Sequence, residues 1–139
     1  MNAKTFVDSN IWLYLFLRDE NAKSSIAEQF VRETAYHDKI VISWQVVNEV
    51  TSVLLKKSFP ESKITVIIEW MCRISTIQDF TEEMLLNASF LRSKHMFSFW
   101  DSLIVAATLA AKCPYLVSED MHHGQKIGTL TIRNIFQDN

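Results

Sequence analysis

The stretch that decides the predicted fold lies near the start of the chain and reads Lys4-Thr5-Phe6-Val7-Asp8-Ser9-Asn10. Its β-favouring residues, Thr5 to Val7, run directly into a carboxylate, which predicts a short buried strand that ends in Asp8. Residues 11–17 are almost wholly apolar, so we expect a helix that begins at a Ser9 or Asn10 cap and packs back against the strand. Because the carboxyl ends of strands line the ligand crevice of an open α/β sheet, Asp8 is a candidate metal or substrate ligand.

The composition indicates one globular unit with little net charge. The chain has 139 residues, 48% of them hydrophobic and 12% aromatic, so we expect a single domain over residues 1–139 with a substantial core. The formal net charge of −2 argues against a polybasic nucleic-acid binder, which would neutralise phosphates with Lys and Arg. An acidic balance still permits nucleic-acid binding if bound cations supply positive charge.

Several classes of protein are disfavoured by features that the sequence lacks. It has two cysteines, no basic leader with a cleavage site, and no apolar run near the roughly 20 residues of a membrane span. We therefore expect a reduced, cytoplasmic setting and no membrane attachment. Gly124 and Gly128 are its two glycines, so dinucleotide-binding and P-loop glycine motifs are excluded from most of the chain.

Hydrophobic patterning predicts single strands separated by pairs of helices. Strands are expected at residues 5–7, 40–42, 73–77, 115–118 and 129–133, and helices at residues 11–17, 22–36, 44–57, 61–71, 82–93 and 99–112. Asn21 could cap the second of these helices, Asp79 or Thr81 the fifth, and Ser98 the sixth. Helical connections between successive strands imply parallel pairing with helices on both faces. The predicted fold is a three-layer α/β/α sandwich with a mainly parallel central sheet of four to five strands.

Four acids fall near the carboxyl edge of this predicted sheet: Asp8, Glu49, Asp101 and Asp120. Carboxylates that converge in one crevice repel each other unless cations neutralise them, and such hard oxygen ligands suit Mg²⁺ or Mn²⁺. A site of this kind activates water and shields phosphate charge.

Each acid also has a purely structural interpretation. Asp8 could only cap the following helix, Glu49 could be solvated surface, and Asp101 could serve a capping box that Ser98 begins. Glu119 and Asp120 could be ordinary turn acids.

Four segments together resemble the PIN-domain nucleases, in particular the VapC-type toxins of bacterial toxin–antitoxin pairs. They are Asp8-Ser9-Asn10, Gln45-Val46-Val47-Asn48-Glu49, Trp100-Asp101-Ser102-Leu103-Ile104-Val105-Ala106-Ala107, and Ser118-Glu119-Asp120-Met121-His122-His123-Gly124. The resemblance implies an Mg²⁺- or Mn²⁺-dependent endoribonuclease that cleaves RNA, binds a cognate antitoxin and forms a homodimer. By position, its metal-binding and catalytic acids would be Asp8, Glu49, Asp101 and Asp120, with Asn10 and Ser118 as supporting polar groups.

The fourth acid departs from the Thr-any-Asp pattern of most of that family. Here the segment is Ser118-Glu119-Asp120, so two adjacent acids compete for the role. Side chains alternate along an extended segment, so Ser118 and Asp120 should share one side and Glu119 the other. We therefore expect Asp120 to be the ligand and Glu119 to be at most supporting.

The remaining conspicuous side chains have mainly structural interpretations. Trp12, Trp44, Trp70 and Trp100 are expected in the core, with base stacking as the alternative. His122 and His123 are expected in a loop and not at a zinc site, because no cysteine lies at ligand spacing. The apolar helix faces could also form a groove for partner helices. The side chains that would line it are Phe16, Phe30, Ile64, Ile68 and Trp70.

A non-catalytic regulatory module, either receiver-like or a degenerate PIN-like domain, is the rival interpretation. A phospho-receiver would need paired acids after the first strand, and here Ser9 follows Asp8. A degenerate nuclease would have lost acids, whereas the sequence retains all four.

Overall fold

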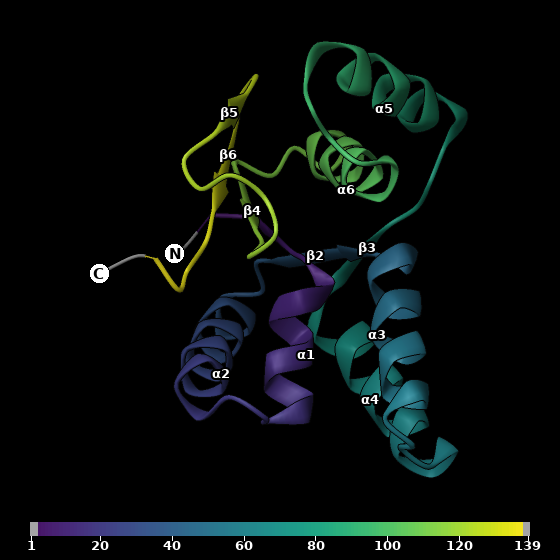
Figure 1. Cartoon of the computed structure of the whole chain (residues 1–139), viewed down its shortest axis with the longest axis vertical. Coiled ribbons are helices and arrows are strands. Elements are labelled where there is room, and N and C mark those ends of the chain that lie inside the picture. The colour runs from purple at the N-terminus through teal and green to yellow at the C-terminus, as the bar shows by residue number, and fades with distance from the viewer. Residues whose placement is uncertain (1–2, 138–139) are drawn as a thin grey trace.

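The computed structural model describes residues 3–137 and shows a six-stranded sheet between two layers of helices (Figure 1). The strands are β1 Thr5–Val7, β2 Ile40–Ser43, β3 Thr76–Gln78, β4 Tyr115–Val117, β5 Lys126–Ile127 and β6 Leu130–Arg133. The helices are α1 Ser9–Leu17, α2 Asn21–Tyr36, α3 Trp44–Lys56, α4 Glu61–Ile74, α5 Glu82–Lys94 and α6 Phe99–Ala110.

The sheet has the order β3-β2-β1-β4-β6-β5, and all its pairings are parallel except that of β5 with β6. Helices α1 to α4 cover one face, and α5 and α6 cover the other (Figure 1). The predicted α/β/α sandwich with a mainly parallel sheet is confirmed. Among the described residues, no helix is both long and apolar enough to cross a membrane.

Element boundaries differ from the prediction mainly around α4 and the end of the chain. The fourth helix continues through Ile74, so β3 begins only at Thr76, because no glycine or proline stops the helix earlier. The two-residue strand β5 was not predicted. It pairs with β6 through a tight turn in which Gly128 takes a φ of 58°, a conformation that glycine adopts without strain.

Two helix caps also differ from expectation. Asp8, and not Ser9 or Asn10, is the N-cap of α1, and its side chain accepts a hydrogen bond from the backbone N–H of Ser9. Glu20, and not Asn21, occupies the N-cap position of α2, without a capping side-chain bond. The expected caps at Thr81 and Ser98 are present, each accepting a backbone N–H with its hydroxyl oxygen.

The middle of the sheet is buried on both faces. Side chains from its three central strands, including Phe6, Ile42 and Leu116, have no exposed surface. Helix α6 lies against β2 and β4, and its residues 102–108 are all buried. Small residues Ala106 and Ala107 let this helix approach the sheet closely, so the carboxyl ends of β1, β2 and β4 are fixed from both sides.

The burial of β4 predicts a large cost for truncating its central side chain. Leu116→Ala removes a fully buried side chain and leaves a cavity, so we expect it to lower the free energy of unfolding by about 2–5 kcal/mol. Leu55→Ala, at an exposed position of α3, should change it by no more than about 0.5 kcal/mol. Urea unfolding of both variants measures the difference, and equal losses would contradict this account of the core.

Candidate active site

Asp8 stands at the centre of the candidate site, and it is both a helix cap and a buried acid. It is 4% exposed at the junction of β1 and α1. One carboxylate oxygen accepts the Ser9 N–H at 2.8 Å, and the other accepts the Ser118 hydroxyl at 2.8 Å. The capping interpretation of Asp8 is therefore correct, and it does not exclude a place in an acidic cluster.

The surroundings of Asp8 disfavour its ionised form. Burial raises the pKa of this carboxyl from 3.8 to about 7, and the nearby charges of Glu49 and Asp101 add to the rise. The hydrogen bonds from Ser118 and Ser9 oppose the rise but do not cancel it. An acid held in this way ionises more readily when a cation lies beside it.

Glu49 and Asp101 approach Asp8 from opposite layers of the sandwich. Glu49 lies on α3 and Asp101 in the first turn of α6, and both carboxyls have a raised pKa, chiefly through partial burial. The charge of Asp101 contributes to the rise at Glu49, and that of Asp120 contributes at both. The Asp101 N–H also donates to the Ser98 hydroxyl at 3.1 Å, so the expected capping contact is present as well.

Asp120 is exposed in the loop after β4, and Asn10 holds it. The Asn10 amide nitrogen donates to the Asp120 carboxylate at 3.0 Å and to the Ser118 hydroxyl at 3.4 Å. Its amide oxygen accepts the Glu119 N–H at 3.2 Å. A single side chain from α1 thus fixes the course of the loop on which the fourth acid lies.

Glu119 faces a different cluster. Its carboxylate accepts a hydrogen bond from the Tyr14 hydroxyl at 2.6 Å and pairs with the Lys23 ammonium at 2.5 Å. Partial burial and the hydrogen bond to this carboxylate raise the pKa of Tyr14 to about 12. The hydrogen bond that Lys23 itself donates to Glu119 raises the pKa of Lys23. Glu119 is therefore engaged by α1 and α2. The Ser118 hydroxyl, in contrast, connects Asp120 to Asp8, because it accepts the Asp120 N–H and donates to the Asp8 carboxylate.

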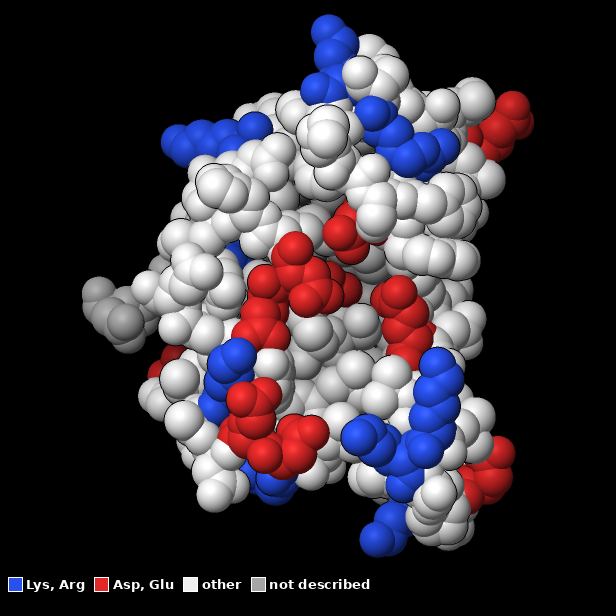
Figure 2. Space-filling view, viewed as in Figure 1, with Lys and Arg blue, Asp and Glu red and all other residues white. Residues whose placement is uncertain are grey.

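The structure brings Asp8, Glu49, Asp101 and Asp120 into one electrostatically coupled group. Acidic side chains gather at the middle of the face shown in Figure 2, around a hollow, and most Lys and Arg side chains lie towards its rim. Asp101 and Asp120 line a cleft of about 450 Å³ together with Lys94, His95 and His122. His122 and His123 lie in a loop, as expected.

The donor set matches the chemistry of a hard divalent cation. Carboxylate and amide oxygens are the available groups, and the raised pKa values show that added positive charge would relieve repulsion among them. Within residues 3–137, no three Asp, Glu, His or Cys side chains are arranged so that they could hold a metal as they stand. Mg²⁺ commonly keeps several water ligands and takes one or two carboxylates, so this donor set fits it.

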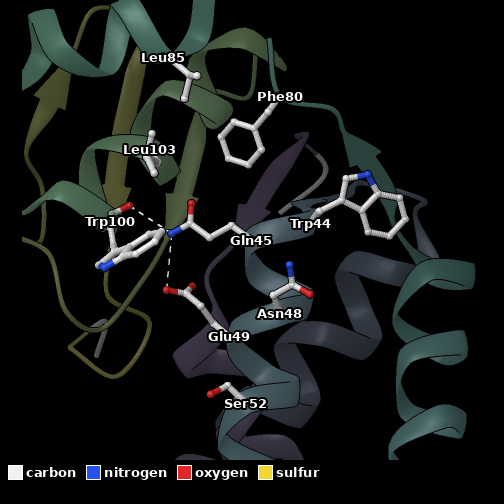
Figure 3. Close-up of a pocket in the computed structure, with 9 residues that line it drawn as sticks. All are labelled: Trp44, Gln45, Asn48, Glu49, Ser52, Phe80, Leu85, Trp100 and Leu103. Atoms are coloured by element: carbon white, nitrogen blue, oxygen red, sulfur yellow. Dashed lines mark hydrogen bonds between the residues drawn. The ribbon is translucent and has the colours of Figure 1, made fainter. Parts of the chain in front are cut away.

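A second, largely apolar pocket adjoins the acids, and the sequence did not predict it. It has a volume of about 440 Å³ and is lined by Trp44, Gln45, Asn48, Glu49, Ser52, Phe80, Leu85, Trp100 and Leu103 (Figure 3).

Two of the four tryptophans are not in the core as expected. Trp44 and Trp100 have exposed fractions of 46% and 58%. Trp12 is fully buried, as expected, and Trp70 is half-buried against it. Trp44 and Trp100 are the first and second residues of their helices, whereas Trp12 and Trp70 lie further along theirs, and this position separates the two pairs.

Comparison with known proteins places this architecture in a family. Residues 5–125, which include all four acids, match the PIN domain model. No curated protein matches the sequence significantly.

Solved structures of toxin–antitoxin proteins share the fold at low sequence identity. The toxin–antitoxin complex from Klebsiella pneumoniae gives a TM-score of 0.70 at 16% identity, and VapBC2 from Rickettsia felis, bound to a promoter DNA fragment, gives 0.71 at 18%. Each match covers 94% of this chain and 97% of the other. Mycobacterium tuberculosis VapC20, a toxin that cleaves the sarcin–ricin loop, gives 0.63 at 16% identity over 81% of this chain and 86% of its own. With the family match spanning most of its length, this chain belongs to the PIN domain family.

Proposed function

We propose that this protein is a metal-dependent endoribonuclease and the toxin of a toxin–antitoxin pair, acting in the cytoplasm. The observation that carries the proposal is the coupling of Asp8, Glu49, Asp101 and Asp120 at one edge of the sheet. Four like charges placed together repel each other and do not help the packing of the fold, whereas a bound cation would make their proximity favourable. Membership of the PIN domain family supports nuclease chemistry at this edge.

In this proposal the four acids hold Mg²⁺ or Mn²⁺, and the remaining polar groups position them. The bound ion supplies an activated water and shields the charge of the phosphodiester. Ser118 and the Ser9 N–H fix the orientation of Asp8, and Asn10 holds the Asp120 carboxylate. Water is the nucleophile in this hydrolysis, so no side chain has to form a covalent intermediate with the RNA.

Charge supports metal-dependent RNA binding. The acids face the place where phosphate must bind, and the chain carries a formal net charge of −2. Two divalent cations would more than offset this charge, so substrate affinity should depend on metal. Lys94 and His95 line the cleft beside Asp101, where they can contact phosphate oxygens.

The structural neighbours support an antitoxin partner, since two of them are toxin–antitoxin complexes. We also propose that the protein forms a homodimer, which would cover some of its exposed apolar side chains. The apolar group suggested from the sequence as a groove for partner helices is partly covered within this chain. Ile64 is buried, the rest are half-buried, and Trp12, Phe16 and Trp70 pack ring against ring. More exposed apolar side chains lie on and just after α5, namely Leu86, Phe90, Met96 and Phe99, so we propose these residues as a surface for protein contacts.

The test of function is cleavage of RNA by the purified protein with Mn²⁺, with Mg²⁺ and with EDTA. We expect cleavage with either ion, none in EDTA, and a loss of at least about 100-fold in Asp8→Asn, since this change removes a charged ligand from the group. Lys57→Gln, at an exposed position after α3, is the control and should cleave normally. Metal-dependent RNA binding without cleavage would favour the regulatory module.

The separation of Glu119 from Asp120 predicts opposite results for two adjacent variants. Asp120→Asn should weaken Mn²⁺ affinity and cleavage by more than about tenfold, or roughly 1.4 kcal/mol. Glu119→Gln should change both by less, because its carboxylate is engaged by Lys23 and Tyr14. Parallel calorimetric titrations and cleavage assays compare them. A larger loss in Glu119→Gln would assign the fourth ligand to that residue.

The pKa of Asp8 predicts how the stability of the metal-free protein varies with pH. Its folded-state pKa, about 7, lies above the ordinary value of 3.8, so the folded state binds more protons between these values. The resulting stabilisation is fully present below about pH 4 and is lost as the pH rises through 7. Glu49 and Asp101 shift in the same direction.

Asp8→Asn should therefore flatten this dependence and be at least as stable as the parent protein at pH 8 in EDTA. Urea unfolding at pH 5 and pH 8 measures both slopes. A marked loss of stability in the variant at pH 8 would show that ionised Asp8 stabilises the fold without metal.

A further inference from the structure

The apolar pocket of Figure 3 lies beside the acids and has its own chemistry. Its walls come from the start of α3, the start of α6, and the segment from Phe80 to Leu85. Three aromatic side chains contribute: Trp44, Phe80 and Trp100. Such walls suit a flat, aromatic ligand, because base–aromatic stacking is favourable for any base.

One buried polar group in the pocket has an unused acceptor. Gln45 is 8% exposed, and its amide nitrogen donates to the Trp100 carbonyl at 3.3 Å and to the Glu49 carboxylate at 3.5 Å. These two acceptors fix the orientation of the amide, and its oxygen is buried without a hydrogen-bond partner. In Figure 3 this oxygen points away from Glu49, on the side of Phe80 and Leu103. A buried acceptor without a donor is costly, so a ligand that brings an N–H group would be favoured.

The pocket and the acidic group share residues, which limits what the occupant can be. Glu49 belongs to both, and Trp100 of the pocket directly precedes Asp101. A volume of about 440 Å³ accommodates one nucleobase with its sugar and is too small for a helix. A nucleotide chain whose phosphate lies at the acids can therefore place a neighbouring base in the pocket.

We propose that this pocket binds a nucleobase of the RNA substrate, stacked against Trp100 and preferably bearing an exocyclic amine that donates to Gln45. The proposal rests on the proposed ribonuclease function and adds a determinant of sequence preference to it. Cytosine carries an amine at the position where uracil carries a carbonyl, so the two bases provide a matched comparison.

The experiment measures binding of fluorescent RNA octamers of adenosine, cytidine or uridine, and of a ribose–phosphate octamer without bases. Asp8→Asn is the background, so that the RNA is not cut during titration. Trp100→Ala and Trp44→Ala are compared with Tyr36→Ala, which removes an exposed aromatic ring from α2, outside the pocket. Thermal melting of each variant checks its fold.

Loss of stacking should weaken binding of the base-bearing octamers about tenfold or more in Trp100→Ala and less in Trp44→Ala. Tyr36→Ala should bind normally, and the octamer without bases should not distinguish Trp100→Ala from its parent. The cytidine octamer should bind more tightly than the uridine octamer. Unchanged binding in Trp100→Ala, or equal affinity for cytidine and uridine, would overturn the proposal.

Two further outcomes separate this proposal from its alternatives. If Trp100→Ala instead abolishes self-association in sedimentation without affecting RNA, the pocket is a contact between copies of the chain and the proposal is wrong. Trp100-dependent binding by a protein that does not cleave RNA in Mn²⁺ would support the pocket while refuting the ribonuclease function. Normal RNA cleavage by the Trp100→Ala variant, together with unchanged RNA binding, would support the ribonuclease function while refuting the role of the pocket.

Discussion

The parallel pairing of β1 with β4 determines where the acids of this protein can lie. Val7 is aligned with Val117, so Asp8 and Ser118 leave the sheet side by side and form a hydrogen bond 2.8 Å long. A slip of one residue in this register would direct each side chain to the opposite face. Asn10 then extends the same junction to Asp120, and the loop after β4 follows from these contacts. The position of the site is thus a consequence of pairing between two buried strands.

The fold class could be predicted from the sequence because it follows from simple periodicities. Strands of continuous β-branched and aromatic residues, separated by pairs of helices, require a covered parallel sheet. Acids that follow such strands must lie at one edge. Glu49 and Asp101 lie on helices, and their selection as site residues depended on the family resemblance, so the roles of the four acids remain a prediction. Alternation along residues 118–120 also anticipated that Glu119 and Asp120 would face different partners, although their roles in metal binding remain a prediction.

The predictions that the structure corrected were wrong for physical reasons. Asp8 was weighed as either a cap or a ligand, but a carboxylate has two oxygens and here serves Ser9 and Ser118 at once. Trp44 and Trp100 were placed in the core because hydrophobicity does not say which side of a helix start faces a cleft. The strand β5 exists through its pairing with β6, which no local pattern reports.

Gln45 joins the two helical layers at the mouth of the site. Through it, the Glu49 side chain of α3 is connected to the main chain of α6 at Trp100, although these helices cover opposite faces of the sheet. The distance between the starts of α3 and α6, which form two walls of the apolar pocket, is therefore fixed by this contact and by the sheet between the two layers. Segments anchored in a common core open to solvent only when the whole cooperative unit opens. The starts of α3 and α6 should consequently move apart only when the buried sheet between them also opens, which gives the apolar pocket a rigid frame.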